Sequence, residues 1–231
     1  REPAALFFTL IFPILMLVVF GAIYGNEPSE FFGGFGYVDT IGPAFIGLVI
    51  AMTGFTSIPG VVASYRERGV LKRLKASPVS SATLLTAWIV VYTLVTVIGS
   101  GLMLVVGRLA FNMQFPGKWY LVAAFAVLSM ISIFAVGFVI ASLAPTVRTA
   151  ETTGMAIYFP MIFLSGATIP VQVFPEGLRK GIQFLPMTHI VELLQGIWFG
   201  NPVSDFLINI FVITGLALVG VAVSAATFRW E

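Results

Sequence analysis

The stretch Tyr65–Ser80, YRERGVLKRLKASPVS, lies between two long apolar runs and is the only long cationic segment of the chain. It holds five of the chain's twelve Lys and Arg residues, namely Arg66, Arg68, Lys72, Arg73 and Lys75. Apolar Val70, Leu71 and Leu74 recur at helical spacing, and Ser77-Pro78 favours a helix end. The pattern predicts a short amphipathic helix, which either rests on anionic lipid head groups or docks into another protein at the membrane surface.

Composition places the chain in a membrane. Hydrophobic residues make up 58 % of the 231 residues, charged residues make up 10 %, and the mean hydropathy is +1.02. Soluble domains carry about a quarter charged residues, so this chain has too few to cover a surface that faces water. We therefore predict an all-α integral membrane protein with a single transmembrane domain over residues 1–231, too short to include a separate soluble catalytic domain.

Six apolar runs suit helical membrane spans, because lipid requires each backbone polar group to be satisfied within its own segment. We predict spans at about 4–24, 41–64, 82–106, 120–143, 152–169 and 206–228. The segment VQVFPEGLRKGIQFLPMTHIVELLQGIWFG before the last run is broken by Pro175 and Pro186. It predicts a re-entrant helical hairpin that enters the bilayer only part-way.

The distribution of Lys and Arg predicts the orientation. An even number of spans puts both termini on one side, together with Arg1, the five cations of the basic segment, Arg148 and Arg229, which makes eight. The other side holds four: Arg108, Lys118, Arg179 and Lys180. By the positive-inside rule, both termini and the basic segment are expected to be cytoplasmic.

Catalytic motifs are missing from the sequence. It has no P-loop pattern for ATP phosphates, no Cys for a disulfide or thiol chemistry, and a single His, which cannot form a zinc site. Gly99-Ser100-Gly101 lies in an apolar run without a nearby base, which disfavours an intramembrane serine hydrolase. The first four spans hold no charge at mid-membrane depth, which disfavours an ion- or proton-coupled secondary transporter or channel, although that class stays the alternative.

His189 and Glu192 form the one ionisable pair with a candidate role. They lie three residues apart, so on a helix they share a face. One interpretation is a proton relay or gate in the hairpin. The other, which we favour, is a polar pair near the outer interface that orients the hairpin.

The chain resembles permeases of the type 2 ATP-binding-cassette (ABC) exporter family over essentially its whole length. The resemblance begins at Arg1-Glu2-Pro3 and continues through a first span that contains Pro13 and ends Phe20-Gly21-x-x-Tyr24-Gly25. Its most specific part is the basic segment, with Glu67-Arg68, Leu71, Leu74 and Ser77-Pro78 in order. It closes in the hairpin with Pro186-x-x-His189 and Gln195.

The resemblance implies an assembly of two permeases, here expected to be a homodimer, with two cytoplasmic ATPase subunits. ATP and magnesium would bind on the ATPases, and this chain would hold no cofactor, no metal and no catalytic residue. The basic segment would be the coupling helix, and an amphipathic helix is expected before Arg1. The implied ATPase contacts are Arg66, Glu67, Arg68, Leu71, Lys72, Arg73 and Leu74, with the two leucines as apolar knobs.

The expected activity is outward movement of an amphipathic, lipid-like or drug-like substrate, or of a lipid-linked glycan, across a bacterial inner membrane by alternating access. We predict a pathway lined by apolar side chains and sparse hydroxyls, which suits such cargo. The predicted pathway residues are Phe12, Phe45, Met52, Thr53, Phe55, Thr56, Phe159 and Phe163. The predicted outer-hairpin residues are Pro186, His189, Glu192 and Gln195.

Overall fold

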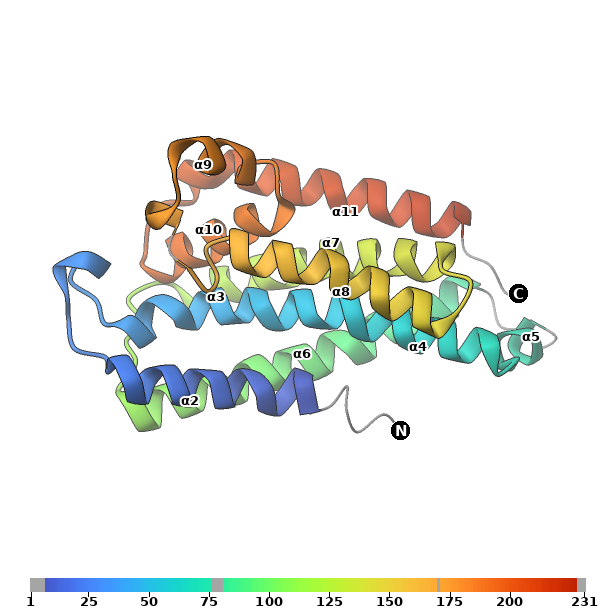
Figure 1. Cartoon of the computed structure of the whole chain (residues 1–231), viewed down its shortest axis with the longest axis horizontal. Helices are drawn as coiled ribbons and strands as arrows, with labels where there is room; N and C mark the ends of the chain where they lie inside the picture. The colour runs from blue at the N-terminus through green and yellow to red at the C-terminus, as the bar shows by residue number, and fades with distance from the viewer. Residues whose placement is uncertain (1–6, 76–80, 170, 228–231) are drawn as a thin grey trace.

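One long helix, Tyr37–Glu67, runs through the centre of the molecule and is the most buried of its apolar helices. It consists of α3 (Tyr37–Met52), a π-helical turn η3 (Thr53–Ser57) and α4 (Ile58–Glu67). The computed structural model describes residues 7–75, 81–169 and 171–227. Around this central helix the other helices form a bundle (Figure 1).

The long helices alternate in direction along the chain (Figure 1). We call the end of the bundle that holds α9 and α10 the hairpin end, and the opposite end the α5 end. The remaining elements are η1 (Phe7–Ile11), α2 (Phe12–Tyr24), η2 (Glu30–Phe32), α5 (Val70–Lys75), α6 (Ser81–Phe111), α7 (Trp119–Leu143), α8 (Val147–Leu164), η4 (Val171–Val173), α9 (Glu176–Ile182), α10 (Pro186–Trp198), η5 (Val203–Phe206) and α11 (Leu207–Thr227).

The described residues form an all-helical protein in which four helices are long and apolar enough to cross a membrane. These are Tyr37–Glu67, Thr86–Phe111, Trp119–Leu143 and Val203–Thr227. The predicted first span corresponds to a shorter apolar helix, Phe12–Tyr24, preceded by η1, and the start of that prediction (residues 4–6) lies outside the described residues. Two short helices, α9 and α10, occupy the segment predicted as a hairpin.

Several predicted boundaries differ from the structure. The central helix begins at Tyr37 rather than at 41, and α6 continues to Phe111 rather than ending at 106. The fifth predicted span, 152–169, is displaced, because the helix runs from Val147 to Leu164. Its start is set by Thr146, whose hydroxyl accepts a hydrogen bond from the backbone N–H of Thr149 at 3.1 Å.

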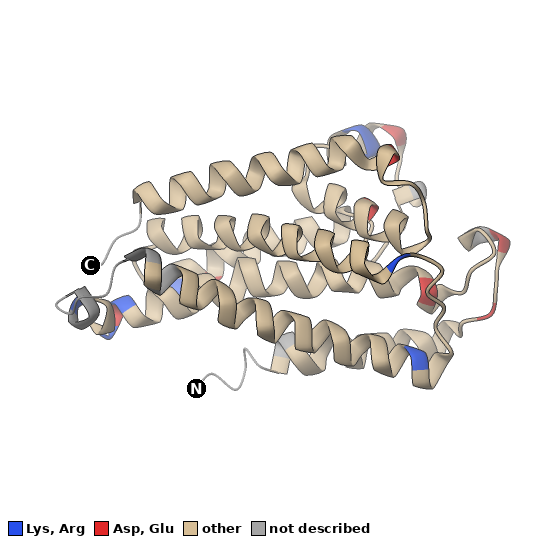
Figure 2. Ribbon diagram, turned by 180° about the vertical axis from the view of Figure 1, so that it is seen from behind, with Lys and Arg blue, Asp and Glu red and all other residues tan. Residues whose placement is uncertain are grey.

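The charged residues gather toward the two ends of the bundle (Figure 2). The helices between those ends expose large apolar side chains, which is the distribution expected of a protein surrounded by lipid. On α6 and α11 in particular the exposed residues include Val91, Leu94, Phe211 and Leu218. The bundle therefore presents an apolar belt between two charged ends.

Candidate functional site

The helix predicted in the basic segment is present as α5, and one of its leucines attaches it to the bundle. The central helix ends at Glu67, and Gly69 turns the chain with a positive φ of 68° before α5 begins at Val70. The Leu71 side chain has 0 % exposure and belongs to the main hydrophobic core. Leu71 thus fixes α5 against the rest of the chain.

This burial corrects one of the predicted docking roles. Leu71 was expected to be an exposed apolar knob, but no part of its side chain reaches the surface. Glu67, Arg68 and Lys72 are exposed. Nothing is described for the side chains of Arg73 and Leu74, or for residues 76–80, which include the predicted stop at Ser77-Pro78.

Arg66 and Glu67 both contact the turn between α7 and α8. The Arg66 guanidinium donates through Nη1 to the carbonyl oxygen of Ala144, the residue that ends α7, at 2.9 Å. The Glu67 carboxylate accepts from the backbone N–H of Val147, the first residue of α8, at 2.8 Å. Each charge matches the helix end it meets, because a helix C-terminus is partially negative and a helix N-terminus partially positive.

A cavity of about 530 Å³ lies where α2, the central helix and α8 meet. Its lining is almost entirely apolar. Six of the eight predicted pathway residues line it: Phe12, Phe45, Met52, Thr56, Phe159 and Phe163. We call this cavity the α2–α8 groove.

The other two predicted pathway residues, Thr53 and Phe55, do not line the groove. Thr53 is fully buried, where its hydroxyl donates to the carbonyl oxygen of Val49 at 2.9 Å and accepts from the Thr96 hydroxyl at 3.2 Å. Phe55 is buried in the core at 1 % exposure. The groove-lining residues Leu48, Met52 and Thr56 are spaced four apart and share one face of the central helix, and Thr53 and Phe55 lie off that face.

Two glycines allow α7 and α8 to approach the π-helical turn η3. A Cβ atom on Gly137 of α7 would overlap the carbonyl oxygen of Gly54, and a Cβ atom on Gly154 of α8 would overlap the carbonyl oxygen of Phe55. The three backbones are therefore in direct contact at the wall of the groove. Close approach through small residues is a common way for helices to pack in membranes.

Among the residues that line the groove, Glu151, the fifth residue of α8, is the only charged one. Its side chain lies beside Gly60 of α4, where an added Cβ would come within 3.4 Å of Glu151 Cγ. Sequence reasoning missed this residue, because the fifth span was expected to begin one residue later. A helix start at the Thr146 cap would have placed Glu151 inside the span.

The outer-hairpin residues each contact a different neighbouring element. Pro186 begins α10, where its missing N–H costs no hydrogen bond. His189 Nε2 lies 2.9 Å from the carbonyl oxygen of Gln183, just after α9. Glu192 Oε2 accepts a hydrogen bond from Asn209 Nδ2 of α11 at 2.9 Å. Gln195 Nε2 donates to the carbonyl oxygen of Thr40 of α3 at 3.2 Å. These contacts orient the hairpin, and no hydrogen bond links His189 to Glu192 among the described residues.

Asp39 is a second residue whose role the sequence did not indicate. It is 1 % exposed, and its carboxylate accepts from Asn26 Nδ2 at 2.9 Å, from the Gln114 backbone N–H at 2.7 Å and from the Gly36 backbone N–H at 3.1 Å. Asp39 thereby joins the loop before α3 to the loop between α6 and α7.

The ABC-2 type transporter family matches residues 1–199 of the chain. The chain belongs to this family. The permeases of the family are multi-pass membrane proteins without ATPase activity of their own, and they pair with ATPase subunits. The predicted family is thus confirmed, as is the expectation that this chain is not itself the ATPase.

The similar proteins include a nodulation protein and two proteins named as probable ABC transporter permeases. Nodulation protein J of Rhizobium leguminosarum bv. viciae is 31 % identical over 93 residues, which is 40 % of this chain and 36 % of that protein. The "Probable multidrug ABC transporter permease YbhR" of Escherichia coli K12 is 26 % identical over 148 residues, 64 % of this chain and 40 % of that protein. The "Probable doxorubicin resistance ABC transporter permease protein DrrC" of Mycobacterium tuberculosis H37Rv is 26 % identical over 223 residues, 94 % of this chain and 78 % of that protein.

The ABC-2 family match covers most of the chain, whereas the alignments with Nodulation protein J and YbhR cover only part of each protein. The aligned part of the chain spans little more than a third of the length of Nodulation protein J and 40 % of YbhR. The ABC-2 family match covers α2 through α10, so it includes the α2–α8 groove, the Arg66 and Glu67 contacts and the hairpin.

Proposed function

We propose that this chain is the transmembrane subunit of an ATP-driven exporter that moves an amphipathic, lipid-like or drug-like substrate outward. The observation that supports this most directly is the α2–α8 groove, an apolar surface with one carboxylate, Glu151, at its α5 end. Aromatic and methionine side chains tolerate varied shapes, and a single carboxylate favours substrates that carry a positive charge.

We propose six membrane spans with both termini and α5 in the cytoplasm. The alternating directions of α2, the central helix, α6, α7, α8 and α11 support an even number of crossings (Figure 1). The excess of Lys and Arg on the side of the basic segment supports the cytoplasmic placement of the α5 end. The hairpin of α9 and α10 would then enter the membrane from the outer side, and the protein would reside in a bacterial inner membrane.

The proposed coupling surface is the exposed side of α5 together with the turn between α7 and α8. A cytoplasmic ATPase pair, which would hold ATP and magnesium, would contact exposed Arg68 and Lys72. Because Glu67 contacts the start of α8 and Arg66 contacts the end of α7, movement of α5 would be passed directly to the helix that lines the groove. This gives ATP binding a mechanical route to the substrate surface, as alternating access requires.

A second copy of the chain is the proposed partner at the groove. Phe159 and Phe163 on α8 are about half exposed, and Ile11 and Leu15 at the start of the first span are also exposed. Two such faces would enclose a pathway between two grooves, which favours a homodimer with its axis beside α2 and α8. ATP-dependent switching would alter the packing across that axis.

The proposal is tested by transport in inside-out vesicles that contain the permease with its ATPase. We expect the ATPase to co-purify, and uptake of a fluorescent cationic amphiphile to require ATP. Arg68→Glu combined with Lys72→Glu should reduce both ATPase co-purification and ATP-dependent uptake. Arg179→Glu combined with Lys180→Glu on α9 serves as the matched control. Uptake that persists without ATP and stops with a protonophore would favour the ion-coupled alternative instead.

A further inference from the structure

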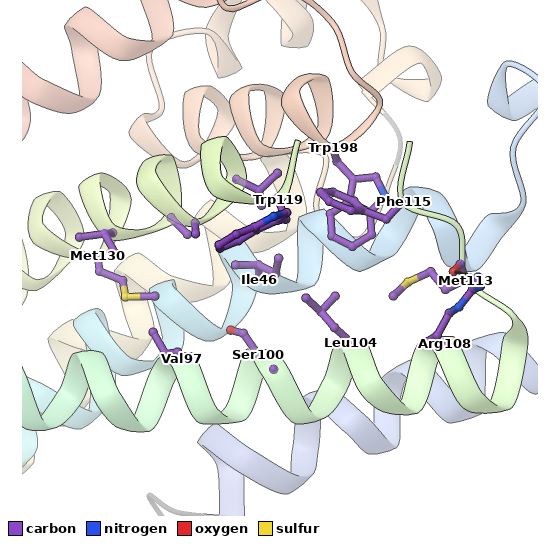
Figure 3. A pocket seen from close by; sticks show the side chains of 15 residues that line it. Ile46, Val97, Ser100, Leu104, Arg108, Met113, Phe115, Trp119, Met130 and Trp198 are labelled. Carbon is purple, nitrogen blue, oxygen red and sulfur yellow. Dashed lines mark hydrogen bonds between the residues drawn. The ribbon is translucent and has the colours of Figure 1, made fainter. Parts of the chain in front are cut away.

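Two cavities adjoin between α6 and α7, on a face that shares no lining residue with the α2–α8 groove (Figure 3). The first has a volume of about 450 Å³ and an apolar lining that includes Val97, Leu104, Val127 and Met130. The second, about 580 Å³, is lined by the polar chain between Arg108 and Pro116, including Asn112 and Gln114. We call the two together the α6–α7 cavity.

The polar and apolar parts meet at Arg108, Met113 and Phe115, which line both. Arg108 Nη1 donates to the carbonyl oxygen of Met113 at 2.9 Å, which holds the guanidinium at the junction. Figure 3 shows Arg108 at one end of the apolar lining and Met130 toward the other. The cavity thus has a cationic end, at the hairpin end of the bundle, and an apolar interior.

Two buried polar groups face the α6–α7 cavity without a hydrogen-bond partner in the described part of the chain. The indole N–H of Trp198, a residue 3 % exposed, and the hydroxyl of Ser100, a residue 7 % exposed, are both unpaired. Both residues line the apolar part. A buried donor without an acceptor destabilises the folded state, so an acceptor inside the cavity would relieve that cost.

The α6–α7 cavity reaches the apolar surface of the bundle. Of the residues that line it, Val97 on α6 and Val127 on α7 are exposed. At the mouth on α7, Trp119 is also exposed, as is typical of a residue at the membrane–water interface. A ligand in this cavity can therefore enter sideways from one leaflet.

We propose that the α6–α7 cavity binds one glycerophospholipid from the leaflet at the hairpin end. Its phosphate would meet the Arg108 guanidinium, an ester carbonyl would accept the Trp198 N–H, and one acyl chain would fill the apolar part. A phosphodiester matches the charge of Arg108, and guanidinium–phosphate pairs are strong. The site is separate from the α2–α8 groove, so it stands whatever the exported substrate proves to be.

Gly101 offers a way to fill the cavity without disturbing the fold. It lines the apolar part, and a Cβ at this position would meet nothing within 4 Å. Gly101→Leu therefore adds volume only where the acyl chain is proposed to lie, and leucine favours helix more than glycine does. Gly215→Leu on α11 is the matched control, because a Cβ there also meets nothing within 4 Å and the residue does not line the cavity.

The experiment is native mass spectrometry of the delipidated permease–ATPase complex titrated with phosphatidylglycerol. We expect one phospholipid per permease copy to be retained at low lipid concentration by the parent complex and by Gly215→Leu, and to be lost in Gly101→Leu. Equal lipid retention in all three would overturn the proposal. ATPase co-purification and ATP hydrolysis are measured in parallel, so failure of this site is distinguishable from failure of the exporter assignment.

The phosphate contact is tested separately with Arg108→Gln. We expect phosphatidylglycerol to bind about fivefold more weakly to this variant, while a diacylglycerol of the same chains binds equally to variant and parent. Arg179→Gln on α9 is the control for the loss of a cation at the same end. Inorganic phosphate should not displace the bound phospholipid. Displacement by phosphate alone, or equal loss with Arg179→Gln, would contradict the proposed lipid site.

Discussion

The Glu67 carboxylate lies 2.8 Å from the backbone nitrogen of Val147, so the end of the central helix is joined to the start of α8. The neighbouring Arg66 contacts the end of α7 through Ala144. Two consecutive residues of opposite charge thus hold the two ends of one turn. Arg66 and Glu67, which the sequence analysis predicted to contact the ATPase, therefore also connect helices within this chain.

Loss of the Glu67 contact is predicted to loosen α8 at the α5 end. In Glu67→Ala the start of α8 loses an anion worth about 1 kcal/mol, which corresponds to a fall of roughly 2–4 °C in melting temperature for a chain of this size. Arg68→Ala, an exposed neighbour, should leave the melting temperature unchanged. ATP-dependent transport should fall more in Glu67→Ala than ATPase co-purification does. Equal melting temperatures for both variants would contradict the contact.

Cysteine labelling tests the six-span arrangement cleanly, because the natural chain has no Cys. Single cysteines at exposed Glu27 and Lys180 are expected to react with an impermeant thiol reagent applied to intact cells. Cysteines at Arg68 and Arg148 are expected to react only after the membrane is opened. Labelling of the Arg68 position from outside would reverse the proposed orientation and remove α5 from the reach of a cytoplasmic ATPase.

Gly154 is predicted to be indispensable for packing at the groove wall. Gly154→Ala places a methyl group on the carbonyl oxygen of Phe55 and forces α8 away from the π-helical turn. Such overpacking typically costs about 1–3 kcal/mol, which thermal unfolding of the purified protein would detect. Gly215→Ala on α11, where the added Cβ meets nothing, is the control. A stability for Gly154→Ala equal to that of the control would show that the backbones are not in contact.

Glu151 is predicted to set a preference for cationic substrates. Glu151→Gln removes the only charge among the residues that line the α2–α8 groove while keeping the shape of the side chain. An attraction between opposite charges of about 1 kcal/mol or more is lost, so uptake of a cationic amphiphile should weaken at least about fivefold relative to a neutral analogue. Glu176 is exposed on α9, and Glu176→Gln should change the uptake of neither the cationic amphiphile nor the neutral analogue. An equal decrease for both substrates would indicate a structural role for Glu151.

Asp39 is predicted to stabilise the hairpin end. In Asp39→Asn an amide N–H₂ replaces one carboxylate oxygen, so at least one of the three donors that face it loses its acceptor. A buried donor left unpaired costs about 1–3 kcal/mol, and the melting temperature should fall accordingly. Asp205→Asn is the control, since Asp205 is exposed and accepts only from the adjacent Ser204 among the described side chains. Identical unfolding of the two variants would argue against the network at Asp39.

The groove residues illustrate how far the sequence predicts a membrane site. Apolar and aromatic residues at helical spacing indicated Phe12, Phe45 and Phe159, which do line one cavity. The same reasoning selected Thr53 and Phe55, which lie off the helix face that Leu48, Met52 and Thr56 turn toward the groove. Which face turns toward the groove leaves no mark in hydropathy, and Glu151 was missed because the helix start depends on a single capping threonine.

By itself, the sequence determined that the chain is helical and that it lies in a membrane. It also determined the positions of most of the long helices and the presence of a basic helix after the second apolar run. These properties depend on local composition, spacing and caps, which act within a few residues. Only the tertiary structure decided that Leu71 is buried, that Glu67 contacts Val147, and that α6 and α7 enclose a cavity. The physical reason is that core-facing and lipid-facing side chains are equally apolar, so the sequence of a membrane helix does not show which face turns inward.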